Sequence, residues 1–355
     1  MAGKIRVLIV DDSIFFREFM SRSLASDPAI DVVGVASDAF EANRKIEELS
    51  PDVLTLDIEM PRMRGTDFLR TVCPRYPRLK VVVISSVSGV VFEALQNGAV
   101  DFVSKPNSQL KVDNSAFIAE TLSKIKIAAA ARFTRMAPAP PPVSKLPAPG
   151  LSKQIGGPAS PASFKNRDAI LAIGASTGGT EAILAVLKDL PANIPGIVIV
   201  QHMPPVFTKM YADRLNKICK ISVREAADGD RVTAGLALIA PGGDRQMRIL
   251  RDPGGYSVRL TAGEKVSGHC PSVDVLFESV AESAGKNAVG VLLTGMGADG
   301  AKHLLTMKKK GAHTIGQDQE SCIVYGMPMV AYNLGAVTEQ LPLTSIAGAV
   351  IKKLS

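Results

Sequence analysis

Apolar runs and helical patterns alternate five times along the first 127 residues. The runs with the length and composition of strands are IRVLIV (5–10), DVVGVA (31–36), DVLTL (52–56), KVVVIS (80–85) and VDFV (100–103). Repeated strand–helix units form a parallel sheet with right-handed crossovers and helices on both faces. We therefore predict an α/β domain over residues 1–127, built on a five-stranded, doubly wound parallel sheet.

This alternation stops near Ala128. Residues 138–161 contain 8 of the 23 prolines, and residues 128–165 contain five Lys or Arg residues but no Asp or Glu. A stretch of this composition lacks the apolar side chains for a core and adopts extended, polyproline-like conformations. We predict a linker over residues 128–165, and we favour a plain spacer over the alternative of an SH3-type ligand at PAPPPV.

A second α/β domain is predicted over residues 166–355. Strands followed by helical patterns are expected at 169–173, 196–201 and 288–295. The short runs GLALIAP (235–241), QMRILR (246–251) and YSVRLTA (256–262) are separated by Gly or Pro turns, which is typical of antiparallel strands. The domain is thus expected to hold a mostly parallel sheet with an antiparallel hairpin or edge.

The turn after the first strand of this second domain carries Ser176. Residues 174–178, GASTG, fit the G-x-S-x-G pattern of a nucleophile elbow, in which the serine hydroxyl is exposed at a tight turn. The same residues loosely fit a phosphate-binding loop, and a serine that only caps the next helix is a third interpretation. The pentapeptide alone does not choose between them.

Candidate partners for Ser176 also lie at strand ends. A serine nucleophile needs a base, and the base needs an orienting carboxylate. His202 directly follows a predicted strand, which the other three histidines do not: His269, His303 and His313. Asp299 lies in the loop after another predicted strand and is our candidate for the orienting carboxylate; Asp318 is the alternative candidate. The order Ser–His–Asp differs from the Ser–Asp–His order of α/β-hydrolases.

The first domain places acidic residues at its own strand ends. Asp11 and Asp12 end the first strand and Asp57 ends the third, while Ser85 ends the fourth and Lys105 follows the fifth. Three carboxylates at one sheet edge repel one another unless a cation lies among them, and hard oxygen ligands suit Mg²⁺. A carboxylate beside Mg²⁺ can attack a phosphoryl donor, with the Lys105 ammonium offsetting the charge that develops.

Composition narrows the possible function classes. Most of the net charge of +7 falls in the linker, and with no Trp and only 5% aromatic residues, nucleic-acid binding is not expected. The four cysteines are far apart and form no C-x-x-C pair, which argues against a disulfide framework or a zinc site. No apolar run has the length of a membrane helix and no signal peptide precedes the first strand, so we expect a cytoplasmic protein.

The first domain resembles the response-regulator receiver family, whose fold is flavodoxin-like. The match rests on VDD (10–12), LDIEMPRMRGTDFL (56–69), SS (85–86) and GAVDFVSKP (98–106). The resemblance implies that Asp57 is the phosphoacceptor and that Asp11, Asp12 and Asp57 hold Mg²⁺. It also implies a switch formed by three further residues: Ser85, Phe102 and Lys105.

The whole chain resembles the chemotaxis protein-glutamate methylesterase family. The matching motifs are AIGASTGGT (172–180), VQHMPP (200–205), IAPGG (239–243), PSVDVLFESV (271–280), LLTGMGADGA (292–301) and TIGQDQESCIVYGMP (314–328). The resemblance implies that Ser176 is the nucleophile, His202 the base and Asp299 its partner. It further implies that the oxyanion forms near the backbone N–H of Met296 and near Thr177.

The reaction implied by this resemblance is hydrolysis of γ-glutamyl methyl esters on chemoreceptor helices to glutamate and methanol, with deamidation of selected glutamines. The implied partners are the chemoreceptor and the histidine kinase of the chemotaxis array; the esterase needs no cofactor, and we expect a monomer. We also expect the receiver to cover the Ser176 edge until Asp57 is phosphorylated. Two positions depart from the family: Gln246 stands where His is usual, and Cys270 where Arg is usual.

Two other function classes compete with this prediction. A nucleotide-binding oxidoreductase would use GASTGG as a phosphate cradle and needs an acid about 20 residues further on. Asp189 comes too early, and the next strand ends in Gln201 and His202. A phosphorylation-dependent adaptor would need only the first domain, and it would keep its function after Ser176→Ala.

Overall fold

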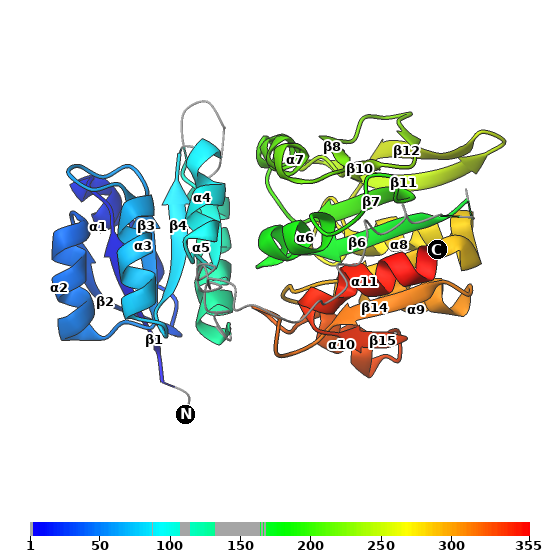
Figure 1. The fold of residues 1–355 in the computed structure, drawn as a ribbon. Coiled ribbons are helices and arrows are strands. Elements are labelled where there is room, and N and C mark those ends of the chain that lie inside the picture. The colour runs from blue at the N-terminus through cyan, green and yellow to red at the C-terminus, as the bar shows by residue number, and fades with distance from the viewer. Residues whose placement is uncertain (1–2, 87, 107–113, 132–163, 165, 167) are drawn as a thin grey trace, which may run out of the picture.

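Two α/β units lie side by side in the computed structural model, which describes residues 3–86, 88–106, 114–131, 164, 166 and 168–355. The N-terminal unit is blue to cyan and the C-terminal unit green to red (Figure 1). The predicted linker lies almost entirely outside the described residues. Helix α5 ends at Ala130, just beyond the predicted boundary at residue 127.

The N-terminal unit has the predicted five-stranded parallel sheet, in the order β2-β1-β3-β4-β5. Its strands are β1 (Ile5–Val10), β2 (Ile30–Ala36), β3 (Val53–Asp57), β4 (Lys80–Ser85) and β5 (Asp101–Ser104). Its helices are α1 (Ile14–Ala25), α2 (Ala39–Leu49), α3 (Gly65–Arg75), α4 (Val91–Gln96) and α5 (Asn114–Ala130), with a 3₁₀ turn at Ser88–Val90. Strands β3 and β4 are buried at every position, as expected for a parallel sheet covered on both faces.

The C-terminal unit has a seven-stranded parallel sheet in the order β15-β14-β13-β6-β7-β10-β8. Its strands are β6 (Ile170–Ala175), β7 (Gly196–Gln201), β8 (Ser222–Glu225), β10 (Leu236–Ile239), β13 (Ala288–Leu292), β14 (His313–Gln317) and β15 (Glu339–Leu341). A separate antiparallel sheet contains β9 (Arg231–Val232), β11 (Arg245–Asp252) and β12 (Gly255–Ala262). The helices are α6 (Gly179–Leu187), α7 (Phe207–Ile218), α8 (Val273–Ala284), α9 (Ala301–Lys309), α10 (Met327–Asn333) and α11 (Leu343–Leu354), with a 3₁₀ turn at Gly285–Asn287.

The prediction for the hairpin region is confirmed in part. Strands β11 and β12 pair antiparallel, but the prediction that GLALIAP is antiparallel is wrong, because β10 lies parallel between β7 and β8. A short apolar run carries no information about strand direction, because it can be buried between its neighbours in either direction. The sequence pattern also does not predict β8, β9 and β15, which are only two to four residues long.

Strand β6 lies at the centre of the large sheet, with β7 on one side and β13 on the other. All three strands are buried at every position. Helix α8 packs closely over β6, since a Cβ atom at Gly174 would lie 2.2 Å from Cγ1 of Val273. In open α/β sheets, ligands bind outside the carboxyl ends of strands where the chain leaves in both directions, and the end of β6 is such a point.

The two domains meet through aromatic side chains. Figure 1 shows α4 and α5 of the first domain facing α6 and α7 of the second. The ring of Phe92 stacks on Tyr211 with centroids 5.5 Å apart, and Phe102 meets Phe207 at 4.7 Å. Buried apolar side chains therefore form a cluster that continues from one domain into the other. Among the helices of the described residues, none has the length and apolar character needed to cross a membrane.

Candidate active site

Ser176 lies in the turn between β6 and α6, at the carboxyl edge of the large sheet. Its backbone N–H donates to the carbonyl of Thr294 at 3.0 Å, and its carbonyl accepts from Nε2 of Gln201 at 2.9 Å. The turn closes through Gly178, whose φ of +78° favours glycine. Gly178 itself is the N-cap of α6, and no side chain caps this helix. The interpretation of Ser176 as a helix cap therefore does not hold.

His202 lies beside Ser176 at the end of the neighbouring strand. Strands β6 and β7 pair Ala175 with Gln201, and the His202 N–H donates to the carbonyl of Ala175 at 3.2 Å. The His202 ring places Nε2 2.8 Å from Oδ2 of Asp299, while Nδ1 is buried and has no hydrogen-bond partner among the described residues. The described residues also include no hydrogen bond between the Ser176 hydroxyl and this ring.

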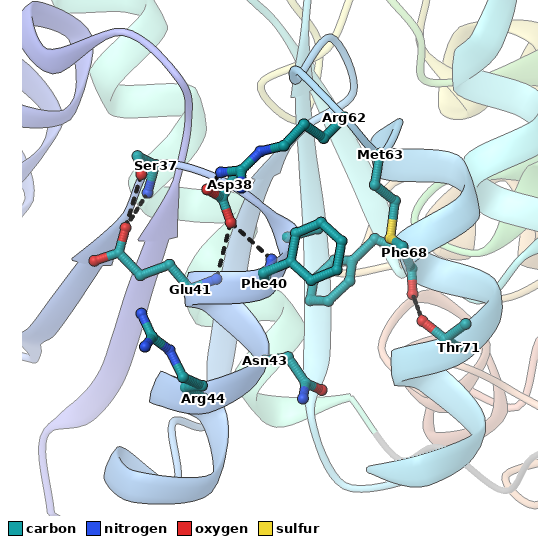
Figure 2. A pocket seen from close by; sticks show the side chains of 11 residues that line it. Ser37, Asp38, Phe40, Glu41, Asn43, Arg44, Arg62, Met63, Phe68 and Thr71 are labelled. Atoms are coloured by element: carbon teal, nitrogen blue, oxygen red, sulfur yellow. Dashed lines mark hydrogen bonds and ion pairs between the residues drawn. The ribbon is translucent and has the colours of Figure 1, made fainter.

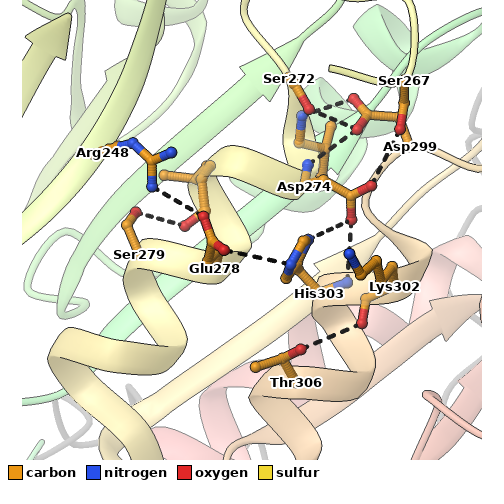
Figure 3. A network of polar contacts seen from close by, with 12 residues as sticks. Arg248, Ser267, Ser272, Asp274, Glu278, Ser279, Asp299, Lys302, His303 and Thr306 are labelled. Carbon is orange, nitrogen blue, oxygen red and sulfur yellow. Dashed lines mark hydrogen bonds and ion pairs between the residues drawn. The ribbon is translucent and has the colours of Figure 1, made fainter.

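Asp299 is the anchor of the His202 ring, and its carboxylate accepts four hydrogen bonds. Besides Nε2 of His202, the donors are Oγ of Ser272 at 2.7 Å and the backbone N–H groups of Val273 at 2.7 Å and Asp274 at 3.0 Å. These groups form the start of α8, as Figure 3 shows. Burial alone would raise the pKa of Asp299, but the hydrogen bonds and the neighbouring His202 bring it below its usual range.

The tautomer of the neutral His202 ring follows from this arrangement. An ionised carboxylate can only accept hydrogen bonds, so the Nε2 that faces Asp299 carries the proton. In this tautomer of the neutral ring Nδ1 carries the lone pair that a general base requires. The ring is bonded to Asp299 and, among the described residues, not to the competing acid, Asp318, whose Oδ1 accepts from the N–H and Oγ of Ser321 at 2.9 and 2.6 Å.

The loop after β13 approaches Ser176 closely. A Cβ atom at Gly295 would lie 2.8 Å from Cβ of Ser176, so only glycine allows this approach. The next residue, Met296, is 46% exposed, and within the described residues no hydrogen bond uses its backbone N–H. The N–H is therefore available for the predicted role of oxyanion donor, which stays a prediction.

Thr177, the second residue predicted near the oxyanion, is bound to the other domain. Its Oγ1 donates to Oδ2 of Asp101 in β5 at 2.7 Å. Asp101 also accepts from Nζ of Lys124 on α5 at 3.0 Å. The N-terminal domain thus contacts the residue next to Ser176.

The acidic residues of the N-terminal domain come together as predicted. Carboxylate oxygens of Asp11, Asp12 and Asp57 lie within 4.8 Å of one another. Nζ of Lys105 lies 2.7 Å from Oδ2 of Asp11 and 2.8 Å from Oδ2 of Asp57. Burial raises the pKa of Asp11, although the bond from Lys105 opposes this shift. The hard oxygen donors of this cluster fit a small divalent cation.

The other two predicted switch residues, Ser85 and Phe102, are both buried. Ser85 is fully buried at the end of β4, and its carbonyl accepts from the Lys105 N–H at 2.9 Å. Phe102 is 3% exposed and carries the contact with Phe207 of the second domain. Lys105 thus contacts Asp57, and Phe102 contacts the second domain.

An open cavity of about 730 Å³ lies elsewhere on the N-terminal domain, between α2 and α3 (Figure 2). Arg62, which pairs with Asp38, lies over the ring of Phe40 at 5.5 Å from the centroid. None of the predicted site residues lines this cavity. Figure 1 places α2 on the side turned away from the second domain. The cavity therefore belongs to neither candidate site.

Fold and site together define a two-domain α/β protein that joins a receiver-type acidic site to a hydrolase-type Ser–His–Asp site. The response regulator receiver domain family matches residues 7–116, and the CheB methylesterase family matches residues 171–350. The chain belongs to the CheB methylesterase family, with a receiver domain at its N-terminal side. We refer to the two units below as the receiver and the catalytic domain.

Individual relatives agree with this assignment over the full chain. The chain is 53% identical over 352 residues to protein-glutamate methylesterase/protein-glutamine glutaminase 2 of Syntrophomonas wolfei, covering 99% of this chain and 98% of the relative. It is 45% identical over 357 residues to the protein-glutamate methylesterase/protein-glutamine glutaminase of Salmonella typhimurium, with coverage of 99% and 98%. The crystal structure of the Thermotoga maritima CheB methylesterase catalytic domain matches with a TM-score of 0.51 and 37% identity, over 52% of this chain and 97% of that one.

Sequence reasoning missed several residues around His202. The ring of His269 stacks on His202 with centroids 3.6 Å apart and planes 11° apart. Gln246, noted only as a departure from the family, is 4% exposed and accepts from the Ser272 N–H at 2.8 Å. The only sequence signal for His269 is its place just before the PSVDVLFESV motif. Residues of this motif donate hydrogen bonds to Asp299.

Proposed function

We propose that this protein hydrolyses glutamyl 5-methyl esters on the cytoplasmic helices of chemoreceptors to glutamate and methanol, and that it deamidates selected receptor glutamines. The names of its full-length relatives support both activities. The single observation that carries the proposal is the His202 ring, which is anchored through Nε2 on Asp299 and keeps a buried, unpartnered Nδ1 one strand away from Ser176.

The proposed chemistry uses this lone pair. Nδ1 of His202 takes the proton of the Ser176 hydroxyl as Oγ attacks the ester carbonyl carbon, and the carbonyl oxygen becomes an oxyanion. The backbone N–H of Met296 donates to that oxyanion, an interaction whose loss typically raises a barrier by about 2.7–4 kcal/mol. His202 then protonates the leaving group, which departs as methanol from an ester or as ammonia from a glutamine amide. A water repeats the sequence on the acyl-enzyme and releases glutamate.

The receiver controls this reaction in our proposal. Asp57 is the phosphoacceptor, the histidine kinase of the chemotaxis array is the phosphodonor, and the setting is the cytoplasm. Asp11, Asp12 and Asp57 would hold Mg²⁺, which supplies positive charge to the phosphoryl oxygens when it is bound. Lys105 already lies between Asp11 and Asp57, where it offsets the charge of the acids and of the incoming phosphoryl group.

Phosphorylation exposes Ser176 in this scheme by weakening the domain interface. The unphosphorylated receiver covers the catalytic edge, since Asp101 holds Thr177 and Phe102 packs on Phe207. A phosphoryl group on Asp57 draws Ser85 and Lys105 toward it and shifts Phe102, which removes part of this contact. The open form then admits a receptor helix, and it frees the Thr177 hydroxyl to assist at the oxyanion.

Methanol release from methyl-labelled receptor membranes tests the proposal. The full-length protein is assayed with and without a small phosphodonor and Mg²⁺. We expect Ser176→Ala to abolish release under both conditions, and Asp57→Asn to keep the basal rate but lose the activation. Ser355→Ala, at the exposed end of the chain, serves as the matched serine control and should change nothing. Equal release by the wild type and Ser176→Ala would contradict the proposed nucleophile, and equal rates with and without the phosphodonor would contradict the regulation.

A further inference from the structure

His269 covers one face of the catalytic imidazole. Its ring lies nearly parallel to the His202 ring, with a centroid distance of 3.6 Å, so water cannot reach that face. The contact comes from the 263–270 loop, between β12 and α8, and not from a strand of the large sheet. The backbone of His269 is fixed by a pair of hydrogen bonds with Val266, at 2.9 and 3.0 Å.

Gln246 of β11 ties this loop to the rest of the site. Its Nε2 donates to the carbonyls of Glu264 at 3.0 Å and His269 at 3.3 Å, and its Oε1 accepts from the Ser272 N–H at 2.8 Å. One buried amide therefore joins the His269 backbone to the residue whose hydroxyl holds Asp299. Both groups that fix the His202 ring, the stacked ring and the carboxylate, are held through the same side chain.

A second contact holds the loop from the outside. Oγ of Ser267 donates to Oδ2 of Asp274 at 3.3 Å, and Oδ1 of Asp274 accepts from the backbone N–H of His303 at 3.0 Å (Figure 3). The same Asp274 gives its backbone N–H to Asp299. The 263–270 loop is thus attached at two points to the start of α8, where the carboxylate of the site is anchored.

We propose that His269 is a positioning residue: its ring fixes the plane of the His202 imidazole so that Nε2 stays on Asp299 and Nδ1 stays available to Ser176, and Gln246 holds His269 in place. The inference rests on the proposed function, because it concerns the same base. His202 has only one hydrogen-bonded ring nitrogen among the described residues, so that bond alone leaves the ring free to turn about it. The stacked ring removes this freedom.

The charge of His269 is compatible with this role. Burial, followed by the neighbouring His202, lowers the pKa of His269 to about 4, so the ring is neutral at pH 7. The other charged groups that face it are Asp299, which favours protonation, and Lys265 of its own loop, which opposes it. A neutral ring can stack on His202 before and after proton transfer, whereas a second imidazolium would repel the protonated base.

The test compares variants of the full-length protein, activated by a small phosphodonor and Mg²⁺, across the pH range of activity. We expect His269→Ala to lower kcat about 10- to 100-fold with KM changed less than about twofold, because the base is misaligned while the substrate surface is kept. His269→Phe, which keeps a flat ring, should recover most of kcat. Gln246→Ala should lower kcat in the same direction but less, by about 3- to 10-fold.

A spectroscopic measurement gives a result that does not depend on activity. The ¹⁵N chemical shifts of the His202 ring, identified by comparison with a His202 variant, report which nitrogen carries the proton. We expect a single tautomer protonated at Nε2 in the wild type and in His269→Phe, and a mixture of tautomers in His269→Ala. His313→Ala, at the opposite edge of the sheet and paired with Glu339, is the matched control and should leave both measurements unchanged.

The outcomes separate this inference from the proposed function. Wild-type kcat and a single tautomer in His269→Ala would overturn the inference while leaving the esterase assignment intact. Absence of Ser176-dependent methanol release in the wild type would overturn the proposed function, and the tautomer measurement would still decide whether His269 fixes the ring. Should His269→Ala fail to fold, Gln246→Ala decides by the same two measurements, and an unchanged kcat and tautomer there would equally overturn the inference.

Discussion

Each candidate site lies at the carboxyl edge of its own parallel sheet, but the side chains of the two sites are held in place in different ways. In the receiver, Asp11, Asp57, Ser85 and Lys105 each end or follow a strand, so the order of the strands alone brings them together. In the catalytic domain only Ser176 and His202 are placed in this way. The comparison shows that the receiver site is a property of sheet topology, whereas the catalytic site also depends on packing between the sheet, α8 and the hairpin.

The catalytic base is supported from outside the large sheet. Asp299 depends on the start of α8, and His269 depends on a loop that Gln246 ties down. Such a site can be damaged by changes that leave every strand in place. The following predictions test this difference, from the largest expected effect to the smallest.

Asp299→Asn should break the catalytic site and leave the receiver site intact. The amide can present an N–H to Nε2 of His202 and so favour the wrong tautomer, a change that lowers kcat by about 10⁴-fold in a comparable triad. We expect a loss of this order in methanol release. Phosphorylation of Asp57, followed with a radiolabelled phosphodonor, should be unchanged. A loss of phosphorylation together with esterase activity would show that the two sites are not independent.

The catalytic domain should lose stability on acidification between about pH 6.5 and pH 4. In this window the unfolded chain protonates His269, whose ordinary pKa is about 6.5, while the folded protein does not, because its pKa there is about 4. The unfolded state therefore binds more protons, and the free energy of unfolding falls as the pH falls, by up to about 3 kcal/mol at pH 4.

Urea unfolding of the catalytic domain in the full-length protein, followed by hydrogen exchange at pH 7 and pH 4.5, measures this effect. His269→Phe has no titrating ring and should show a smaller decrease. The same decrease in wild type and His269→Phe would contradict the assignment to this residue.

Phe92→Ala should loosen the contact between the domains without touching either site. The ring stacks on Tyr211 and is covered by Arg214, whose guanidinium lies 5.6 Å from its centroid. Weakening the interface by about 1–2 kcal/mol enlarges the open population about 5- to 30-fold, so basal methanol release should rise by up to this factor. Phe40→Ala, on the exposed α2 face of the same domain, is the matched control. A basal rate unchanged by Phe92→Ala would contradict the blocking role of the receiver.

Those parts of the molecule that follow from the pattern of apolar positions along the chain could be predicted from the sequence. The five receiver strands and the strand-end positions of Ser176 and His202 could be predicted because buried parallel strands are continuous apolar runs and their ends share one edge. The direction of β10 could not, because a four-residue run is compatible with either direction. Neither could the His269 stack, since it depends on how the 263–270 loop folds back over the sheet.

The sequence led us to expect that the receiver covers the Ser176 edge, but it could not predict the individual contacts between the domains. Asp101 lies next to the predicted switch residue Phe102 but shows no pattern that would single it out. Its bond to Thr177 follows only from the way two separately folded units pack. The predicted boundaries of the linker stay a prediction, because most of that segment lies outside the described residues.

If the proposed regulation holds, the hydrogen bond between Thr177 and Asp101 makes a receptor helix an effector of the receiver as well as a substrate of the catalytic domain. Under the proposed regulation, whatever favours the open form favours phosphorylated Asp57, and thermodynamic coupling works equally in both directions. A receptor helix seated at Ser176 takes the place of the receiver at Thr177 and so stabilises the phosphorylated state. A crowded array of methylated receptors would therefore keep its own demethylating enzyme switched on, and activity would decay as the substrate is consumed.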